Sequence, residues 1–96
     1  MHAKKQFYVI AYDITDDRRR QQIVKTLEPL GVRINWSVFE CMLTPLQFEK
    51  VKEALIKIAG TSKDRIVIYP ICRECFTKII YLPIRKRATS QKVVVV

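Results

Sequence analysis

The pattern of apolar and polar residues alternates between strand-like and helix-like segments. Residues 7–12 are apolar, mostly aromatic or β-branched, and lack Gly and Pro, which predicts a strand covered on at least one face. Two later segments repeat apolar residues at helical spacing and predict two amphipathic helices. The first helical stripe consists of Ile23, Val24, Leu27 and Leu30, and the second of Phe48, Val51, Leu55 and Ile58.

Capping residues mark the expected ends of both helices. Thr15, Asp16 and Asp17 offer a choice of N-cap residues for the first helix, and their acids suit the positive end of its dipole. Thr44-Pro45-Leu46-Gln47 has the pattern of a capping box with Pro at the first helical position. Gly31 and Gly60 are expected to end the two helices.

The segment 33–43 changes phase in its middle. Ile34, Trp36 and Val38 share one parity, whereas Phe39, Cys41 and Leu43 continue on the other. This predicts a kink, bulge or break near Ser37, and leaves open whether the segment is one strand or two. Further strands are expected over residues 64–71 and 78–82, the second ended by Pro83.

This order of elements predicts an α+β fold. It fits a ferredoxin-like sandwich with two helices on one face of an antiparallel sheet and an extra C-terminal strand, in a single domain over residues 1–96. A chain of 96 residues has a thin core, and Val93–Val96 forms a β-prone end that needs a sheet edge. We therefore expect a homodimer, with 84–96 a basic tail ending in a dimer-linking strand.

The charge of the chain favours a polyanionic partner. Lys and Arg number 18 against 9 Asp and Glu, which gives a net charge of +9. The alternative interpretation is that these charges only keep the protein surface well solvated. Clustering favours nucleic acid, DNA or RNA, and the expected phosphate-binding residues are Arg18, Arg19, Arg85, Lys86 and Arg87.

The sequence gives no indication of a membrane protein. The N-terminal residues lead into only a short apolar run without a small-residue cleavage site, and no run approaches the roughly 20 residues needed to cross a bilayer. We expect a cytoplasmic protein without membrane contact.

The three cysteines fall into two groups. Cys41 lies in an apolar segment and is expected to be an inert core residue. Cys72 and Cys75 form one C-x-x-C, which supplies at most two zinc ligands per chain, and the preceding residues only loosely offer the helix start that a redox pair requires. We interpret the pair as structural, and a disulfide between them stays open.

Asp13 is the leading candidate for chemistry. It follows the first strand directly and precedes an arginine cluster, an arrangement suited to phosphates. It either caps the following turn or binds a metal ion that prefers oxygen. Asp16 and Asp17 are expected to be occupied at the helix cap. No histidine-based nucleophile system is expected near Asp13, because the only histidine, His2, lies in the N-terminal tail.

Several short motifs resemble a known family in order and spacing. These are Tyr12-Asp13-Ile14, a helix containing Arg20, Gly31-x-Arg33, Ser37-Val38-Phe39-Glu40 and Tyr69-Pro70-Ile71-Cys72-x-x-Cys75. They are similar to the small universal CRISPR-associated protein that partners the CRISPR integrase, often described as an endoribonuclease. Asn35-Trp36 departs from the family's more frequent Gln.

The resemblance implies residue roles. In the family, Asp13 corresponds to the metal-binding acid for Mg²⁺ or Mn²⁺, doubled across a homodimer whose last strands cross between partners. The positions matching family residues important for nuclease activity are Tyr12, Arg20, Arg33 and Phe39. The competing interpretation makes Tyr12 and Phe39 packing residues, Arg20 an ion-pair partner of Asp13 or Asp16, and Arg33 a surface charge.

Three functions follow as alternatives. The first is spacer DNA acquisition with the CRISPR integrase, including Mg²⁺-dependent cleavage of single-stranded RNA or duplex DNA at Asp13. The second is a purely structural DNA-binding adaptor that bridges two integrase dimers through sequence-independent phosphate contacts. The third is an RNA- or protein-binding module without catalysis, in which Tyr8, Trp36 or Phe39 stacks on bases, although such aromatics are more often core residues.

Overall fold

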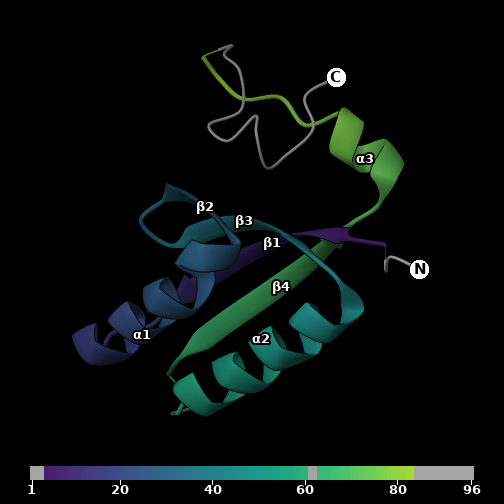
Figure 1. Cartoon of the computed structure of the whole chain (residues 1–96). Coiled ribbons are helices and arrows are strands. Elements are labelled where there is room, and N and C mark those ends of the chain that lie inside the picture. The colour runs from purple at the N-terminus through teal and green to yellow at the C-terminus, as the bar shows by residue number, and fades with distance from the viewer. Residues whose placement is uncertain (1–3, 61–62, 84–96) are drawn as a thin grey trace.

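The computed structural model describes residues 4–60 and 63–83. Its elements are β1 (Gln6–Asp13), α1 (Asp17–Leu27), the 3₁₀ turn η1 (Glu28–Leu30), β2 (Gly31–Asn35), β3 (Val38–Leu43), α2 (Pro45–Ile58), β4 (Arg65–Ile71) and α3 (Arg73–Thr77). The strands form one antiparallel sheet in the order β2-β3-β1-β4, as Figure 1 shows. The predicted C-terminal strand and the basic tail over 84–96 lie outside the described residues.

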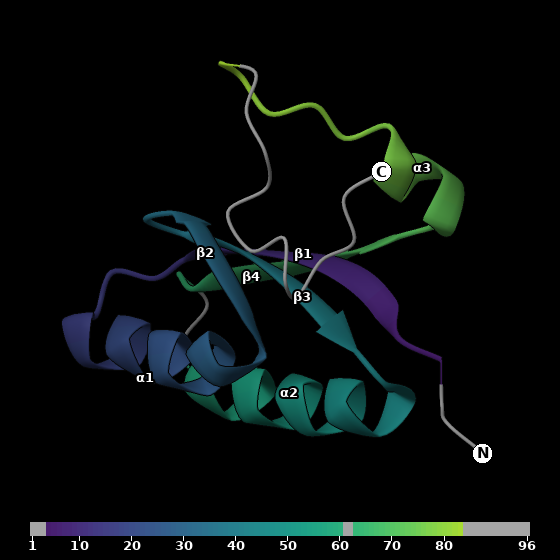
Figure 2. The same ribbon diagram turned by 45° about the horizontal axis from the view of Figure 1, so that its top comes forward.

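Helices α1 and α2 lie side by side against one face of the sheet, whereas α3 lies beyond the other face (Figure 2). The main core fills the space between the sheet and the two long helices. The buried residues of both predicted helical stripes are Ile23, Leu27, Val51, Leu55 and Ile58. They meet Ile10 and Tyr12 from β1 and Phe39, Cys41 and Leu43 from β3. The α+β sandwich predicted from the sequence is confirmed. None of the helices in the described ranges is long and apolar enough to span a bilayer.

The predicted helix starts are confirmed. Asp16 caps α1, because its carboxylate accepts a hydrogen bond of 2.9 Å from the Arg19 amide. Thr44 and Gln47 form a reciprocal capping box on α2, with each side chain accepting a bond from the other residue's amide, at 2.9 and 3.2 Å. Both helices therefore begin where local side chains satisfy otherwise unpaired amides.

Gly31 does not end α1, so that expectation is wrong. Helix α1 stops at Leu27, and Pro29 lies in the 3₁₀ turn that follows. Gly31 is instead the first residue of β2, in an extended conformation. A Cβ at this position would lie 2.3 Å from the Glu40 carbonyl oxygen and 2.5 Å from the Cys41 sulfur. Close approach of β2 to β3, and not a left-handed backbone, requires glycine here.

The segment 33–43 forms two strands. Asn35 pairs with Val38, so Trp36 and Ser37 make a two-residue hairpin turn, and the register shifts between Arg33 and Asn35. The turn and this bulge together account for the change of parity seen in the sequence.

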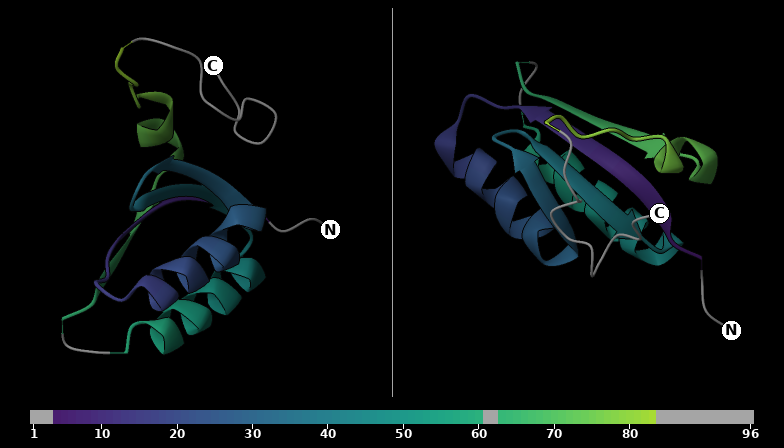
Figure 3. Two further views of the ribbon diagram at one scale, coloured as in Figure 1. Left: turned by 90° about the vertical axis from the view of Figure 1, so that its left-hand side faces the viewer. Right: turned by 90° about the horizontal axis from the view of Figure 1, so that it is seen from above.

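The strand expected over residues 78–82 is absent, so this expectation is also wrong. The short helix α3 follows β4 instead, and Phe76 packs edge-on against Phe7 of β1 with ring centroids 4.8 Å apart. The chain then runs across the sheet face opposite α1 and α2 (Figure 3), where the Tyr81 hydroxyl donates a 2.5 Å hydrogen bond to the Glu40 carboxylate. Packing on this face, and not pairing at a sheet edge, fixes the segment.

Candidate nucleic-acid and metal site

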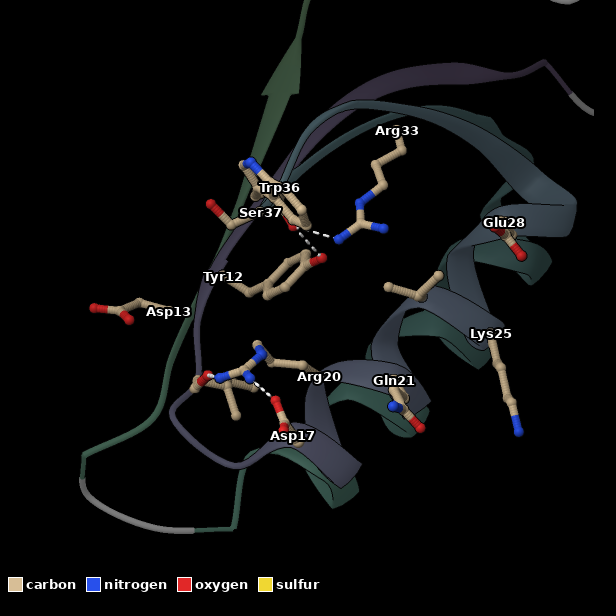
Figure 4. Close-up of a pocket in the computed structure, with 12 residues that line it drawn as sticks. Tyr12, Asp13, Asp17, Arg20, Gln21, Lys25, Glu28, Arg33, Trp36 and Ser37 are labelled. Atoms are coloured by element: carbon tan, nitrogen blue, oxygen red, sulfur yellow. Dashed lines mark hydrogen bonds and ion pairs between the residues drawn. The ribbon is translucent and has the colours of Figure 1, made fainter.

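The end of β1 places its last two side chains on opposite faces of the sheet. Tyr12 is buried on the helix side, whereas Asp13 is exposed on the other side and points away from Tyr12 (Figure 4). Register pairing sets Asp13 opposite Arg65 of β4. Among the described residues, the Asp13 carboxylate has no hydrogen-bond or ion-pair partner. It is therefore available for a ligand.

The neighbouring carboxylates are both engaged, Asp16 at the helix cap as predicted and Asp17 in an ion pair with Arg20 instead of the cap. Within residues 4–60 and 63–83, no group of three or more His, Cys, Asp or Glu side chains gathers in a way that could hold a metal ion. Asp13 is thus the only one of these three acids that a single chain leaves unengaged.

Arg20 reaches back from α1 toward the end of β1. Its guanidinium donates hydrogen bonds of 2.8 Å to the carbonyl oxygens of Ile14 and Thr15, in addition to its ion pair with Asp17. Arg20 therefore orders the loop between β1 and α1. Its acidic partner is Asp17, in place of the Asp13 or Asp16 considered from the sequence.

Tyr12 and Arg33 fix the hairpin turn to the sheet. Both side chains donate hydrogen bonds of 2.8 Å to the carbonyl oxygen of Trp36. The Tyr12 amide also donates to the Ser37 carbonyl at 3.0 Å, and the Asn35 side chain accepts a bond from the Ser37 amide at 3.1 Å. The turn between β2 and β3 is therefore anchored to the end of β1.

Phe39 lies wholly in the core. It has no exposed surface, and its ring is inclined by 29° to that of Tyr12 with centroids 6.4 Å apart. In this position Phe39 supports Tyr12 and does not reach solvent. Tyr8 is likewise occupied, since its ring stacks on Phe48 at 4.6 Å.

A pocket of about 810 Å³ lies between α1 and the hairpin turn (Figure 4). Its walls include Tyr12, Arg20, Arg33 and Ser37, together with three residues that the sequence did not single out for a site, Gln21, Val24 and Lys25. The Trp36 indole also borders the pocket and is 85% exposed. The change of parity near Ser37 was the signal in the sequence that placed Trp36 at a turn.

The arginines of the first cluster differ in their surroundings. Arg19 forms an ion pair of 2.9 Å with Asp64, whose side chain is fully buried, and so ties α1 to the start of β4. Arg18 is exposed and has no partner among the described residues. The predicted contacts Arg85, Lys86 and Arg87 lie outside the part of the chain that the structure describes.

The cysteines occupy two different environments. Cys41 is buried, and its burial together with the nearby Glu40 raises the pKa of the thiol to about 12. Cys72 and Cys75 are exposed free thiols, with Cys72 as the N-cap of α3. The Cys75 amide donates a 3.3 Å hydrogen bond to the Cys72 sulfur, which lowers the pKa of Cys72, while the neighbouring Cys72 raises the pKa of Cys75. The helix start that the sequence only loosely offered is present.

We expect iodoacetamide to label Cys72 first at neutral pH. Its lowered pKa gives it a larger thiolate fraction than Cys75, and the thiolate is the nucleophile. Cys41 should stay unlabelled in the folded protein because it is buried. Peptide mapping by mass spectrometry measures the three rates, and unfolding in denaturant provides the control, since all three should then react alike. Faster labelling of Cys75 than of Cys72 would contradict the assignment.

The fold and the end of β1 define a small ferredoxin-like domain with a free carboxylate among basic residues, an arrangement suited to nucleic-acid phosphates. Residues 6–79 match the family model of CRISPR associated protein Cas2, and the chain belongs to this family. A relative from Synechocystis sp., named CRISPR-associated endoribonuclease Cas2 3, is 42% identical over 72 residues, which cover 75% of this chain and 78% of the relative. The resemblance noted in the sequence is confirmed.

Solved structures agree with the fold. Streptococcus pyogenes Cas2 superposes with a TM-score of 0.70 at 26% identity, over 79% of this chain and 98% of that one. A chain of a partial Cas6-RT-Cas1–Cas2 complex superposes with a TM-score of 0.71 over 86% of this chain and 91% of that one. At 23% identity, the second similarity concerns the fold alone.

Proposed function

We propose that this chain is a homodimeric, DNA-binding protein that acts with CRISPR integrase dimers in spacer DNA acquisition. In this proposal, Asp13 provides a secondary, metal-dependent endonuclease activity on single-stranded RNA or duplex DNA. Membership of the Cas2 family supports the pathway, and the endoribonuclease name of the Synechocystis relative supports the hydrolytic activity. The integrase partnership follows from the same family membership.

The proposal depends on which charged side chains have a hydrogen-bond or ion-pair partner at the end of β1 and the start of α1. Asp16, Asp17, Arg19 and Arg20 all form local or long-range contacts. Asp13 and Arg18, in contrast, are exposed and have no partner in the described part of the chain. A free carboxylate and a free guanidinium at one end of the sheet suit a metal ion and a phosphate, respectively.

The proposed homodimer interface is the sheet face opposite α1 and α2. Register rows on this face bring together Phe7, Met42 and Ile71, and also Ala11, Val38 and Val67. Phe76 and Tyr81 cover part of it, but Val67 and Tyr69 on the edge strand β4 stay 42% and 51% exposed. An apolar face beside an open edge is suited to a second copy of the chain. Because Asp13 shares this face, a two-fold packing would place both copies of Asp13 at one interface.

Asp13 fits a sparse magnesium site. Mg²⁺ in nucleic-acid enzymes is often held by one or two carboxylates, with water and substrate phosphates completing its coordination. Asp13 from each of two chains matches this donor set, and Mn²⁺ prefers the same oxygen ligands. When bound, such an ion activates water and offsets charge on the scissile phosphate. The roles of this chain's residues are then distinct: Asp13 binds, Arg20 orders the loop, and Tyr12 with Arg33 positions the adjacent turn.

Neutralising arginines that are predicted to contact phosphates tests the DNA-binding role. We expect the triple substitution Arg18→Gln, Arg85→Gln and Arg87→Gln to weaken duplex binding for every DNA sequence. Each lost phosphate contact should flatten the slope of log affinity against log salt by about 0.9. Fluorescence anisotropy over a series of salt concentrations gives this slope directly.

Lys50→Gln serves as the matched control, because Lys50 is an exposed cation on α2, outside these clusters. Its slope should equal that of the unmodified protein. A triple variant whose slope and affinity are also unchanged would overturn the assignment of these arginines to phosphate binding. Arg19→Gln is left out of the series, since loss of its ion pair with buried Asp64 would alter stability as well.

A further inference from the structure

Trp36 is an unusual residue for the tip of a hairpin. Two-residue turns favour small or polar residues such as Gly, Asn and Asp. Here the turn instead presents an indole that is 85% exposed, with the Arg33 guanidinium 5.7 Å from the centre of its ring. A large aromatic held in solvent beside a cation is an arrangement that binds flat, electron-rich ligands.

The turn holds this indole on a fixed support. The main-chain carbonyl of Trp36 accepts bonds from two side chains, and the main chain of Ser37 is bonded to β1 and to the Asn35 side chain. All of these contacts involve the backbone at Trp36 and Ser37. The main chain that carries the indole is therefore held in place before any ligand arrives, which reduces the entropy lost on binding.

The composition of the adjacent pocket indicates the class of ligand. Its volume of about 810 Å³ lies within the usual range for small-molecule sites, roughly 300–1,000 Å³. Its cations, Arg20, Lys25 and Arg33, outnumber by only one the acids Asp17 and Glu28, since the Asp13 carboxylate points away from the pocket. A polyphosphate would favour a strong excess of positive charge. The small excess of positive charge, the aromatic wall and the hydrogen-bonding side chains of Gln21 and Ser37 suit a nucleobase with a single phosphate.

We propose that the pocket between α1 and the hairpin turn binds one unpaired nucleotide of DNA or RNA, with its base stacked on Trp36 and its phosphate near Arg33 or Lys25. A base inside a duplex has both faces stacked, so only an unpaired base can use this platform. The site rests on the nucleic-acid binding proposed above and adds to it a preference for ends that carry an overhang over blunt ends.

The chain contains one tryptophan, so its intrinsic fluorescence reports on Trp36 directly. The probes are a blunt duplex, the same duplex with a short single-stranded overhang, and that overhang with abasic positions. We expect the overhang to quench the emission saturably and to bind on the order of 5- to 100-fold more tightly than the blunt duplex, from the strength of base–aromatic stacking. The abasic overhang should behave like the blunt end.

Trp36→Ala should abolish the preference for the overhang, and Trp36→Phe should retain part of it. Both variants should keep the affinity for the blunt duplex, because the turn is anchored through its main chain. An undiminished preference in Trp36→Ala, equal binding of the abasic overhang, or unchanged emission with DNA and RNA overhangs alike would each overturn the site. If the unmodified protein does not bind the blunt duplex, the proposed DNA-binding function is wrong. Failure of the Trp36 site and failure of the proposed function are therefore distinguishable.

Discussion

Replacing Asp13 with Ala is expected to lower metal-dependent cleavage of RNA or duplex DNA by at least about 100-fold, because the substitution removes the site's carboxylate ligand. The fold should survive, since the Asp13 side chain is exposed and has no partner among the described residues. Cleavage of labelled single-stranded RNA and duplex DNA across a Mg²⁺ titration measures the loss, and circular dichroism melting checks the fold. For the unmodified protein, the rate should rise with pH, because the attacking water must lose a proton.

Glu53→Ala is the matched control, because it removes another exposed carboxylate, from the surface of α2. Its cleavage rate should match that of the unmodified protein. Cleavage that persists in rigorously purified Asp13→Ala would place the activity at another site or in a contaminant. We expect DNA affinity and spacer integration to survive Asp13→Ala. Integration lost while DNA binding and dimerisation stay intact would make the carboxylate part of integration itself.

Gly31→Ala is expected to destabilise the fold by about 3 kcal/mol or more, at the upper end of overpacking effects. The added Cβ would lie 2.3 Å from the Glu40 carbonyl oxygen, and that atom belongs to the backbone of the paired strand β3. The backbone cannot move aside without disturbing the hydrogen bonds between β2 and β3. Urea unfolding followed by circular dichroism measures the change in the free energy of unfolding.

Gly60→Ala provides the comparison within the same chain. The nearest atoms to a Cβ at Gly60 are 3.8 and 3.9 Å away, and neither glycine has a positive φ. This substitution should be neutral, or stabilising by up to about 1 kcal/mol through the unfolded state. Equal denaturant midpoints for the two variants would show that β2 and β3 tolerate a wider separation at Gly31.

The parts of the fold that could be predicted are those fixed by nearby residues. The apolar stripes of α1 and α2, the Thr44 capping box and the engagement of Asp16 and Asp17 all depend on neighbours within one or two helical turns. The expectation that Gly31 ends the first helix is wrong because a glycine that follows a helical apolar stripe has the sequence pattern of a helix end. Pro29 had already ended the helix, and the need for glycine comes from a strand that lies ten residues further along the chain.

Long-range packing accounts for the other errors and omissions. The apolar residues after α3 resemble a strand, but their place is set by Phe76 against Phe7 and by Tyr81 against Glu40. In the candidate site, the sequence indicated that Tyr12 and Arg33 matter. It did not indicate that both bind one main-chain carbonyl, because a pattern of side chains carries no information about backbone acceptors. The pairing of Arg19 with Asp64, 45 residues away, was invisible for a similar reason.

The position of β1 in the sheet has a consequence for the growing chain. β1 is first in sequence yet central in space, with β3 on one edge and β4 on the other. During synthesis, the hairpin of β2 and β3 can pair with β1 early, but the second edge of β1 waits until residues 65–71 have left the ribosome. A nascent chain that ends before β4 therefore carries an open apolar edge, and completion of the sheet is a late event in the life of each molecule.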